Sequence, residues 1–426
     1  MKKSNARKVV VIGGGGREHA IAVALKRSEG VELIAIPGNA GIAQIAECVT
    51  DIKATEVDKI VQYIASRGDV YLTVVAPDDP LAMGLVDKLE ARGLRAFGPR
   101  ANAAYLEASK AYAKDLMKKY GIPSAGYECF DELNKALKYL QKSKYPIVIK
   151  ADGLALGKGV VIADNYTEAA KAATEMLEGG RFGSAGHRIV VEEFLTGFEV
   201  SVLAFTDGDA VVPMVSSQDH KRAYDGDNGP NTGGMGAYSP SEKYTDVMHR
   251  TAMETIFLPT IRAMKTEGRE FRGVIYYGLM IGSDGVPKVL EYNARFGDPE
   301  TQVVLPRLKS DLLQIMEACI DGGLDKVSVE WSDEAAVCVV AASGGYPGDI
   351  EKGKEIAIGV MPPKATVYHA GTATDGDKMV TSGGRVLCVS AVGKSMDEAR
   401  KIAYEGIDKI KFEGMFYRGD IGGSGK

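Results

Sequence analysis

The sequence predicts a multidomain protein of mixed α/β and α+β class. We expect an N-terminal doubly wound parallel sheet, a central unit with an inserted subdomain, and a small C-terminal β-rich domain. The length of 426 residues suits two to four domains. The first hundred residues alternate continuous apolar strands with amphipathic helices, and short strands with glycine and proline turns dominate after about residue 329.

Composition and charge exclude several classes of protein. Lysine and arginine total 52 against 57 aspartates and glutamates, so the net charge of −5 provides no basic field to recruit nucleic acid. The five cysteines are scattered without a Cys-x-x-Cys pair, which is typical of a reducing compartment. The apolar run Val9–Ile12 is too short for a signal peptide, and no window approaches the roughly 18 apolar residues of a membrane span. We therefore expect a cytoplasmic protein with no nucleic-acid or membrane partner.

The N-terminal elements are predicted by apolar runs without alternation, which are typical of parallel strands buried on both faces. The expected strands are Val9–Ile12, Leu33–Ile36 and Val70–Val75. The expected helices are Arg17–Arg27, Val57–Ser66 and Leu81–Ala91. Strands and helices in this alternating order predict the doubly wound sheet.

The middle of the chain changes pattern several times. A helix is expected over Ser109–Tyr120, closed by Gly121 and Pro123. The inserted subdomain is expected to contain strands Tyr145–Lys150, Val160–Ala163 and Arg188–Phe194 and helix Thr167–Glu178. Later strands are expected at Glu199–Phe205, Val211–Val215, Val274–Ile281 and Lys288–Asn293, and later helices at Thr251–Thr266, Thr301–Asp321 and Met396–Lys409. The polar segment Ser216–Pro240 is expected to be a long loop, either functional or disordered.

Glycine is the one departure in composition, with 51 in 426 residues against an average of about 7%. One group, Gly13–Gly16, lies between the first strand and the first helix, where backbone N–H groups can bind an anion. A nicotinamide dinucleotide site would need an acidic residue at the end of the second strand, and the run Ile36–Asn39 supplies none. A structural turn or a monophosphate site is therefore favoured.

A second glycine loop lies within Lys150–Val160. Because valine follows Gly159, the run is not a P-loop. Between two strands it can form a hairpin whose N–H groups close over phosphates, with Lys150 supplying positive charge. A hairpin with only a structural role is the alternative.

Carboxylate and amide side chains near residue 291 indicate a metal site. On a strand, Glu291, Asn293 and Arg295 share one face, and Leu290 and Tyr292 are expected to point into the core. Carboxylate and amide oxygens suit Mg²⁺, and the guanidinium beside them can hold an oxyanion. A salt-bridged edge strand is the alternative.

Two further segments allow two interpretations each. Glu192–Leu195 offers backbone groups and Glu199 offers a carboxylate to ribose hydroxyls, unless they form only a solvated acidic turn. The segment Gln218–Gly236 combines cations, amide and hydroxyl donors and glycine backbone, which suits a sugar phosphate and a small polar ligand. A disordered loop is the alternative for that segment.

Several motifs occur in a characteristic order along nearly the whole chain. They are Gly15–Ala20, Pro37–Gly41, Ile149–Val160, Asp219–Arg222, Gly229–Gly236, Arg295–Gln302, Gly344–Asp349 and His369–Thr372. Taken in order, they resemble the ATP-grasp superfamily and, within it, the phosphoribosylamine–glycine ligase family. The chain departs from the family pattern at Ala76–Leu81 and at Ala108, so no role is carried over to Asp78.

The resemblance implies a pre-ATP-grasp domain over residues 1–103, an ATP-grasp domain over 104–328 with an inserted lid at about 123–190, and a C-terminal domain over 329–426 with a flexible tail from Gly422. It implies that ATP, with Mg²⁺ or Mn²⁺, drives the joining of glycine to 5-phosphoribosylamine through glycyl phosphate, giving glycinamide ribonucleotide, ADP and phosphate in de novo purine biosynthesis. The expected partners are these small molecules, and the expected state is a monomer or weak dimer. Another ATP-grasp carboxylate–amine ligase and a non-catalytic nucleotide-binding module are the alternatives.

The resemblance also implies roles for individual residues. Catalytic roles are expected for Arg295, Lys150 and Asp219. ATP is expected to contact Lys110, Lys150, Gly153, Gly157, Lys158, Gly159, Glu192, Glu193, Phe194, Leu195 and Glu199. The other substrates are expected at Gly15, Gly16, Arg17, Glu18, Asn39, Asp219, Lys221, Arg222, Asn231, Thr232, Gly233, Arg295 and Asp298. The metal is expected at Glu291 and Asn293.

Overall fold

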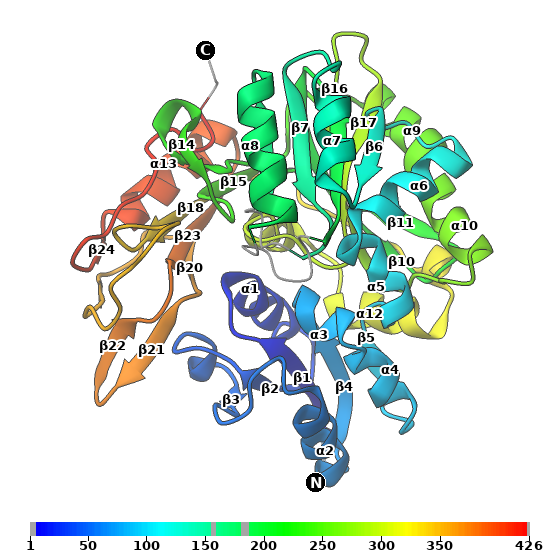
Figure 1. The fold of residues 1–426 in the computed structure, drawn as a ribbon. Coiled ribbons are helices and arrows are strands. Elements are labelled where there is room, and N and C mark those ends of the chain that lie inside the picture. Colours follow the sequence, from blue (N-terminus) through cyan, green and yellow to red (C-terminus); the bar gives the residue numbers. More distant parts are fainter. Residues whose placement is uncertain (1–5, 155–158, 180–186, 424–426) are drawn as a thin grey trace, which may run out of the picture.

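The computed structural model describes residues 6–154, 159–179 and 187–423. Within these residues an N-terminal parallel-sheet unit, a central unit and a smaller C-terminal unit meet around helix α1 (Gly16–Leu25) (Figure 1). This arrangement confirms the predicted fold class. In the part of the chain that is described, no helix is both long enough and apolar enough to cross a membrane.

The N-terminal sheet is parallel, with the strand order β3-β2-β1-β4-β5. Its strands are β1 (Arg7–Gly13), β2 (Val31–Pro37), β3 (Glu47–Cys48), β4 (Val70–Val75) and β5 (Ala96–Phe97). Its other helices are α2 (Val57–Arg67), α3 (Asp78–Ala82) and α4 (Leu85–Glu90). The predicted helix Leu81–Ala91 is interrupted because Gly84 has a φ of +79°, a left-handed conformation that glycine adopts readily. Strands β1 and β2 end side by side, at Gly13 and Pro37, next to the start of α1.

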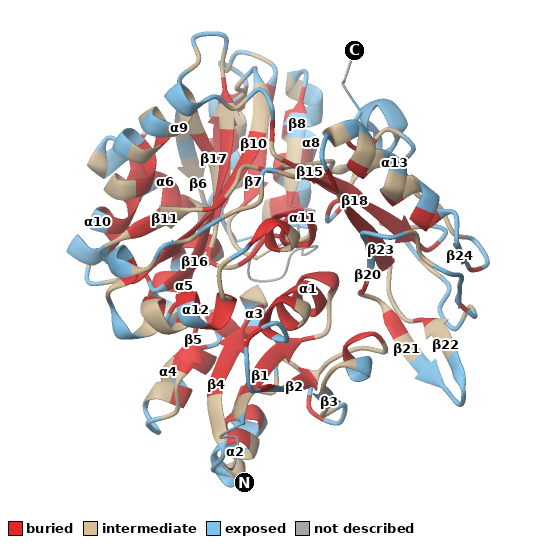
Figure 2. Ribbon diagram, turned by 180° about the vertical axis from the view of Figure 1, so that it is seen from behind, coloured by how far each residue is buried: buried red, intermediate tan, exposed pale blue. Residues whose placement is uncertain are grey.

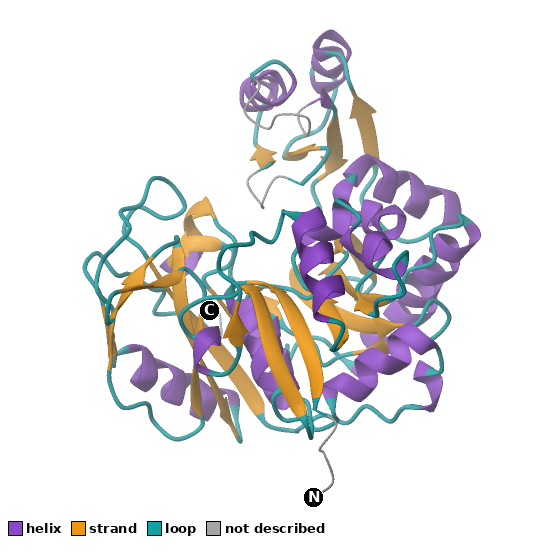
Figure 3. Cartoon of the chain, turned by 90° about the horizontal axis from the view of Figure 1, so that it is seen from below, coloured by secondary structure: helices purple, strands orange, loops and turns teal. Residues whose placement is uncertain are grey.

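A small antiparallel sheet stands apart from the rest of the chain when the molecule is seen from below (Figure 3). Its strands, in sheet order, are β6 (Tyr127–Phe130), β9 (Ile189–Glu193), β7 (Ile147–Ala151) and β8 (Val160–Ala163), and its helices are α7 (Leu133–Leu140) and α8 (Tyr166–Leu177). Buried side chains such as Ile149 and Val191 form a separate hydrophobic core within it. The sequence pattern does not predict β6, which is four residues long and has no fully buried residue. We call this unit the lid.

The central sheet is antiparallel, with the order β11-β10-β16-β17. Its strands are β10 (Phe198–Thr206), β11 (Val211–Pro213), β16 (Gly273–Ile281) and β17 (Pro287–Asn293). The helices beside it are α5 (Ala101–Ala108), α6 (Lys110–Tyr120), α9 (Asp246–Ala252) and α10 (Leu258–Thr266), whose outer surfaces are exposed over buried strands (Figure 2). The predicted helix Thr251–Thr266 begins earlier, at Asp246, because the Thr245 side chain caps the chain there.

The segment Ser216–Pro240, expected to be a loop, contains strands of its own. These are β12 (Gln218–Asp219), β13 (Arg222–Tyr224), β14 (Asn228–Asn231) and β15 (Gly236–Ser239). Strand β15 pairs with β18 of the C-terminal unit, which gives an antiparallel sheet in the order β12-β15-β18-β23-β20. The strands of this unit are β18 (Ala335–Ala342), β19 (Ala357–Ile358), β20 (Ala365–His369), β21 (Thr372–Asp375), β22 (Lys378–Thr381), β23 (Arg385–Gly393) and β24 (Ile410–Lys411), and its α-helix is α13 (Met396–Ile407). The pairing partner of β15 lies far along the chain, so local pattern cannot reveal it.

One further expectation is corrected by the structure. The predicted helix Thr301–Asp321 consists of α11 (Thr301–Val304) and α12 (Leu312–Asp321), separated by a turn that contains Pro306.

The tail expected to be flexible from Gly422 is described only as far as Gly423. Gly422 is buried, Gly423 is exposed, and the Gly423 N–H donates to the Asp420 carbonyl at 3.1 Å. Residues 424–426 lie outside the described part, and the flexibility of the tail stays a prediction.

One buried carboxylate joins the end of β10 to the segment that leads into the C-terminal sheet. Asp207 is 6% exposed and accepts backbone N–H bonds from Asp209, Ala210, Gly323 and Leu324 at 2.8–3.1 Å. Burial favours the neutral acid, but the N–H donors outweigh it and lower the pKa of Asp207. The charged carboxylate is therefore part of the folded state.

Asp207→Asn is expected to lower the free energy of unfolding at pH 7 by about 1–3 kcal/mol, because an amide binds these N–H groups less strongly and adds an unpaired donor. Since the folded-state pKa lies below the unfolded value of about 3.9, this stabilisation is present above that value and is lost as the pH falls through the folded pKa. Urea unfolding at pH 7 and at pH 3 measures the free energy of unfolding of the parent and of the variant. The difference between the two proteins should be smaller at pH 3. Asp209→Asn is the control, because that side chain is 73% exposed; equal destabilisation by both changes would contradict the prediction.

Candidate active site

The glycine loop that follows β7 is tied to the first turn of α6. Asp152 accepts the Ala111 N–H at 3.1 Å, and the Lys110 Nζ donates to the Gly153 carbonyl at 2.7 Å. Burial lowers the pKa of Lys110, and the nearby Glu291 carboxylate partly offsets this. The first turn of α6 therefore places a buried amine at the base of the loop.

Buried charges join the lid to α6 and β17. The Lys150 Nζ lies 3.0 Å from Glu192 Oε1 and donates to the Leu290 carbonyl at 3.1 Å. The Lys114 Nζ lies 2.9 Å from Glu192 Oε2, and burial lowers the pKa of Lys114. Sequence reasoning missed Lys114, although its spacing of four residues from Lys110 places both on one face of the helix. The Glu192 carboxylate is therefore used inside the protein, and Glu192 is also paired with Tyr127 of β6 and Val148 of β7.

A carboxylate on β17 of the central sheet pairs with a lysine ammonium. The Lys221 Nζ lies 3.3 Å from Glu291 Oε1 and 3.4 Å from Glu199 Oε2. Lys221 is the main cause that lowers the pKa of Glu291 to about 2, against the effect of burial. Glu291 is in turn the main reason why the pKa of Lys221 lies well above its usual value. The site therefore holds an ionised carboxylate with a lysine as its counter-ion.

A second carboxyl group nearby titrates in a different range. Burial raises the pKa of Asp219 to about 7, and Lys221 opposes this shift while Glu300 adds to it. Glu300 is 4% exposed, and burial raises its pKa as well. Sequence reasoning missed Glu300, which lies within a recognised motif but was assigned no role. Asp219 can thus gain or lose a proton near neutral pH.

A buried carboxylate of α5 orients the residues at the end of β17. Glu107 accepts the Asn293 Nδ2–H at 2.8 Å and the Ala294 N–H at 2.7 Å, and the Arg295 Nη2 lies 3.0 Å from it. Burial raises the pKa of Glu107, and the Arg295 guanidinium opposes this shift. Because Nδ2 of Asn293 is engaged, its Oδ1 is the atom left for a cation. Glu107 was not predicted, since no motif contains it.

Strand β17 does not alternate as predicted. A β-bulge interrupts its pairing with β16 at Leu290. Val289 and Tyr292 are both buried, whereas Leu290 is only half-buried and its carbonyl accepts the Lys150 Nζ–H. The prediction that Leu290 points into the core is therefore wrong, because the extra residue of the bulge resets the alternation.

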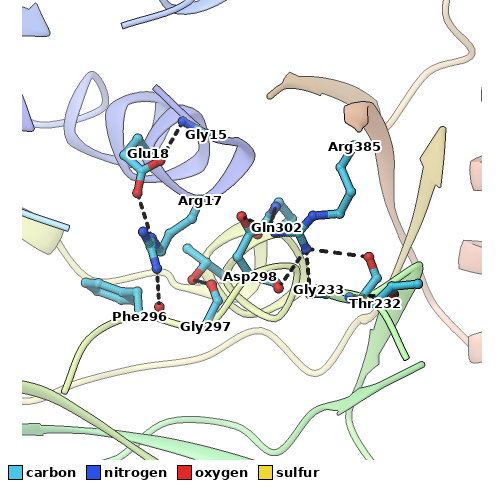
Figure 4. A network of polar contacts seen from close by, with 12 residues as sticks. Gly15, Arg17, Glu18, Thr232, Gly233, Phe296, Gly297, Asp298, Gln302 and Arg385 are labelled. Carbon is cyan, nitrogen blue, oxygen red and sulfur yellow. Dashed lines mark hydrogen bonds and ion pairs between the residues drawn. The ribbon is translucent and has the colours of Figure 1, made fainter. Parts of the chain in front are cut away.

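The first glycine loop uses its own acidic residue at the start of α1. The Gly15 N–H donates to Glu18 Oε2 at 2.6 Å, and the Arg17 Nε donates to Glu18 Oε1 at 2.6 Å (Figure 4). Arg17 also donates to the Phe296 carbonyl at 3.2 Å. Glu18 therefore caps the helix and shapes the loop, in which Gly14 and Gly15 are half-buried and Gly16 and Arg17 are buried.

The loop after β14 meets Asp298 and the C-terminal unit. Thr232 is buried, and its Oγ1 donates to the Lys221 carbonyl at 2.9 Å. The Gly233 carbonyl accepts the Arg385 Nη1–H at 2.6 Å, and the Arg385 Nη2 lies 3.0 Å from Asp298 Oδ2 (Figure 4). The structure thus brings Thr232, Gly233 and Asp298 together with Arg385, which sequence reasoning missed.

Other expected residues lie at the edges of this region. The Arg222 guanidinium donates to the Gly229 carbonyl at 2.8 Å within the β13–β14 hairpin, where Asn231 is its pairing partner. Glu193 is exposed at the end of β9, and Phe194 and Leu195, in the crossover to β10, are half-buried. Gly159, the last glycine of the loop, is the first described residue after position 154. Gly157 and Lys158 lie outside the described residues.

A separate cavity of about 580 Å³ lies between the N-terminal unit and the β20–β22 region. Its lining includes His19, Gly41, His369 and Lys378. Burial lowers the pKa of His19 to about 3 and that of His369 to about 4, so both imidazoles are neutral at physiological pH. Asn39 Nδ2 donates to the His369 carbonyl at 2.7 Å, so Asn39 links the two units beside the cavity.

Family models match three successive parts of the chain. The N domain of phosphoribosylglycinamide synthetase matches residues 7–107, its ATP-grasp (A) domain matches residues 108–301, and its C domain matches residues 336–424. Together these matches cover most of the described chain.

Curated relatives and solved structures agree with this match. Phosphoribosylamine–glycine ligase of Halalkalibacterium halodurans is 49% identical over 97% of this chain and 96% of its own length, and that of Vibrio cholerae is 48% identical over 97% of both. The crystal structure of phosphoribosylamine–glycine ligase from Thermotoga maritima superposes with a TM-score of 0.86 at 38% identity, covering 97% of this chain and 99% of that one.

A more distant structure shares the fold alone. The biotin carboxylase domain of Hydrogenobacter thermophilus 2-oxoglutarate carboxylase, in complex with MgADP and bicarbonate, has a TM-score of 0.75 at 16% identity, covering 96% of this chain and 91% of that domain. The full-length matches at higher identity are more specific, and they confirm the resemblance that the motifs indicate. The chain therefore belongs to the phosphoribosylamine–glycine ligase family of ATP-grasp enzymes.

Proposed function

We propose that the chain is an ADP-forming carbon–nitrogen ligase that joins glycine to 5-phosphoribosylamine, giving glycinamide ribonucleotide and phosphate in purine biosynthesis. The proposal rests on the closeness of Lys110 and Lys150 to Glu291, next to Asn293, in a chain 49% identical to a phosphoribosylamine–glycine ligase over 97% of its length. Amino groups opposite carboxylate and amide oxygens suit a nucleoside triphosphate with its cation.

ATP is proposed to bind between the lid and the central sheet. Its phosphates would lie near Gly153 and Gly159 beside Lys110 and Lys150, its adenine along the backbone of Glu192–Leu195, and its ribose at Glu199. The separate core of the lid supports this placement, because a unit with its own core can open and close as one body. The half-exposed Glu199 carboxylate is available at the surface of the crevice.

Glu291 and Asn293 fit a divalent cation, either Mg²⁺ or Mn²⁺. The lowered pKa of Glu291, about 2, keeps this carboxylate ionised at every physiological pH. The hydrogen bond from Asn293 Nδ2 to Glu107 leaves Oδ1 as a second hard oxygen donor. When bound, the cation would neutralise charge on the phosphates. Lys221, which pairs with Glu291 here, would then be free to pair with another anion.

The proposed reaction has two steps. A carboxylate oxygen of glycine attacks the γ-phosphorus of ATP, the bond to ADP breaks, and glycyl phosphate forms. The amine nitrogen of phosphoribosylamine then attacks the acyl carbon, phosphate leaves, and the nitrogen loses a proton. Arg295, held by Glu107, is placed to stabilise the oxyanion at the acyl carbon, and Asp219 is suited to accept the proton. Closure of the lid would keep water from glycyl phosphate.

The proposed function predicts a product pattern. Purified protein with ATP, Mg²⁺, glycine and freshly made phosphoribosylamine is expected to form ADP, phosphate and glycinamide ribonucleotide in equal amounts, measured by anion-exchange chromatography and mass spectrometry. Alanine or bicarbonate in place of glycine is the control, and either should give little product. Formation of AMP, or ADP release that does not respond to the amine, would overturn the assignment. A non-catalytic module would form no product at all.

Glu291→Ala is expected to abolish turnover while the fold stays intact, because the cation would lose its charged ligand. Loss of several kcal/mol of charge stabilisation corresponds to a rate decrease on the order of a hundredfold or more. Steady-state ADP release and circular dichroism measure the two quantities. Glu254→Ala, at an exposed helical position, is the matched control and should be near normal. Near-normal activity of Glu291→Ala would remove this residue from the metal site.

Asp219→Asn is expected to remove the acidic limb of the pH–rate profile. In the parent, kcat/KM for the amine should rise with pH through about 7, because Asp219 must lose its proton before it can accept one from the amine. The variant should be slower at pH 8 by about 10²-fold, without this limb. A limb that persists unchanged in the variant would belong to the substrate amine itself and would contradict the role given to Asp219.

A further inference from the structure

Arg385 reaches from the C-terminal sheet into the loop region of the central unit. It is the first residue of β23. Its Nη1 donates to the Gly233 carbonyl at 2.6 Å and to the Asp298 carbonyl at 2.9 Å, and its Nη2 lies 3.0 Å from Asp298 Oδ2 (Figure 4). One guanidinium therefore holds two segments that are far apart in the sequence. Its planar fork of donors allows this, whereas the single ammonium of a lysine does not.

A second C-terminal side chain completes the contact from the other direction. The Gly233 N–H donates to the Tyr346 hydroxyl oxygen at 2.9 Å. Both backbone polar groups of Gly233 are therefore held by the C-terminal unit. A Cβ on Gly233 would lie 3.1 Å from Arg385 Cζ and 3.3 Å from the Tyr346 hydroxyl, which shows how closely the loop fits. The ring of Tyr346 packs against Gly384, where a Cβ would approach it to 2.2 Å.

Asp298 connects this contact to the N-terminal glycine loop. Its Oδ1 accepts the Gln302 Nε2–H at 2.7 Å, while its Oδ2 is engaged by Arg385. A Cβ on Gly16 would lie 2.7 Å from Gln302 Nε2, and one on Gly15 would lie 3.7 Å from Asp298 Oδ2. The N-terminal glycine loop, the loop with Gly233 and the segment with Asp298 thus meet around one carboxylate. These three segments are the ones expected to bind the sugar phosphate and the amine.

We propose that Arg385 and Tyr346 are positioning residues for the amine substrate. By holding Gly233 and Asp298, they set the loop against which a phosphorylated ribosylamine binds, and they make the C-terminal unit part of that site. Neither residue needs to touch ATP, since Lys110 and Lys150 lie on α6 and in the lid. This inference rests on the proposed function.

The test compares Michaelis constants in four variants of the full chain. Arg385→Ala is expected to raise KM for phosphoribosylamine about tenfold or more, because a charge-assisted hydrogen bond is worth about 1.5–3 kcal/mol. Arg385→Lys should lie between this variant and the parent, and Tyr346→Phe should raise KM about fivefold, as expected for the loss of about 1 kcal/mol. KM for ATP should change less than twofold in all of them. Arg400→Ala is the matched control, because its guanidinium donates to the carbonyls of Gly419 and Ile421 and lies over the Tyr404 ring, all within the C-terminal unit.

The outcomes separate this inference from the function on which it rests. If the parent forms no glycinamide ribonucleotide, the proposed function fails and this inference fails with it. If the parent is active and Arg385→Ala and Tyr346→Phe keep the parental KM for the amine, only the positioning role is overturned. An equal rise in the KM values for ATP and amine would indicate a general structural effect and also overturn it. Should Arg385→Ala not fold, Arg385→Lys and Tyr346→Phe decide by the same measurement.

Discussion

The geometry of the candidate site depends on one buried carboxylate. Glu107, at the end of α5, holds the Asn293 amide, the Ala294 N–H and the Arg295 guanidinium at 2.7–3.0 Å. Without that carboxylate, Arg295 would lose its ion-pair partner at 3.0 Å, and the Asn293 amide could exchange its oxygen for its nitrogen at the cation. The orientation of two proposed functional side chains, Asn293 at the end of β17 and Arg295 just after it, therefore comes from a helix at the junction with the N-terminal unit.

Charge balance is the second constraint on this crevice. The Glu192 carboxylate lies between the amines of Lys114 and Lys150, and Lys221 lies between the carboxylates of Glu199 and Glu291. Groups of opposite charge thus lie between groups of like charge. The amines therefore repel one another less, as do the carboxylates, when no nucleotide is bound. A triphosphate that brings its own cation adds both signs of charge at once. Because ATP with one divalent cation keeps a net negative charge, the amines of Lys110, Lys150 and Lys221 would supply the balancing positive charge.

Sequence patterns predict those parts of this chain in which neighbouring residues carry the information. The strands of the parallel sheet follow from continuous apolar runs, and Glu291 and Asn293 follow from residue type and spacing. The helix break at Gly84 was not predicted because a single backbone conformation decides it. The strands within residues 216–240 were not predicted because a distant pairing partner decides them. Glu107 and Arg385 were not predicted for a related reason. Glu107 binds Asn293, 186 residues away, and Arg385 binds Asp298 and Gly233, 87 and 152 residues away, so only the folded chain brings the partners together.

The distant pairing has a consequence for the substrate loop. Strand β15 pairs with β18, and β18 pairs with β23, whose first residue is Arg385. The loop that contains Gly233 and the arginine that holds it are therefore linked by two successive backbone ladders. A slip of one residue in either ladder would move every side chain of the strand to the opposite face, so the register is strongly specified. Gly236 supports that register, since a Cβ there would lie 2.6 Å from the Cys338 carbonyl oxygen. The C-terminal unit thus shapes the loop through backbone hydrogen bonds as well as through the Arg385 side chain.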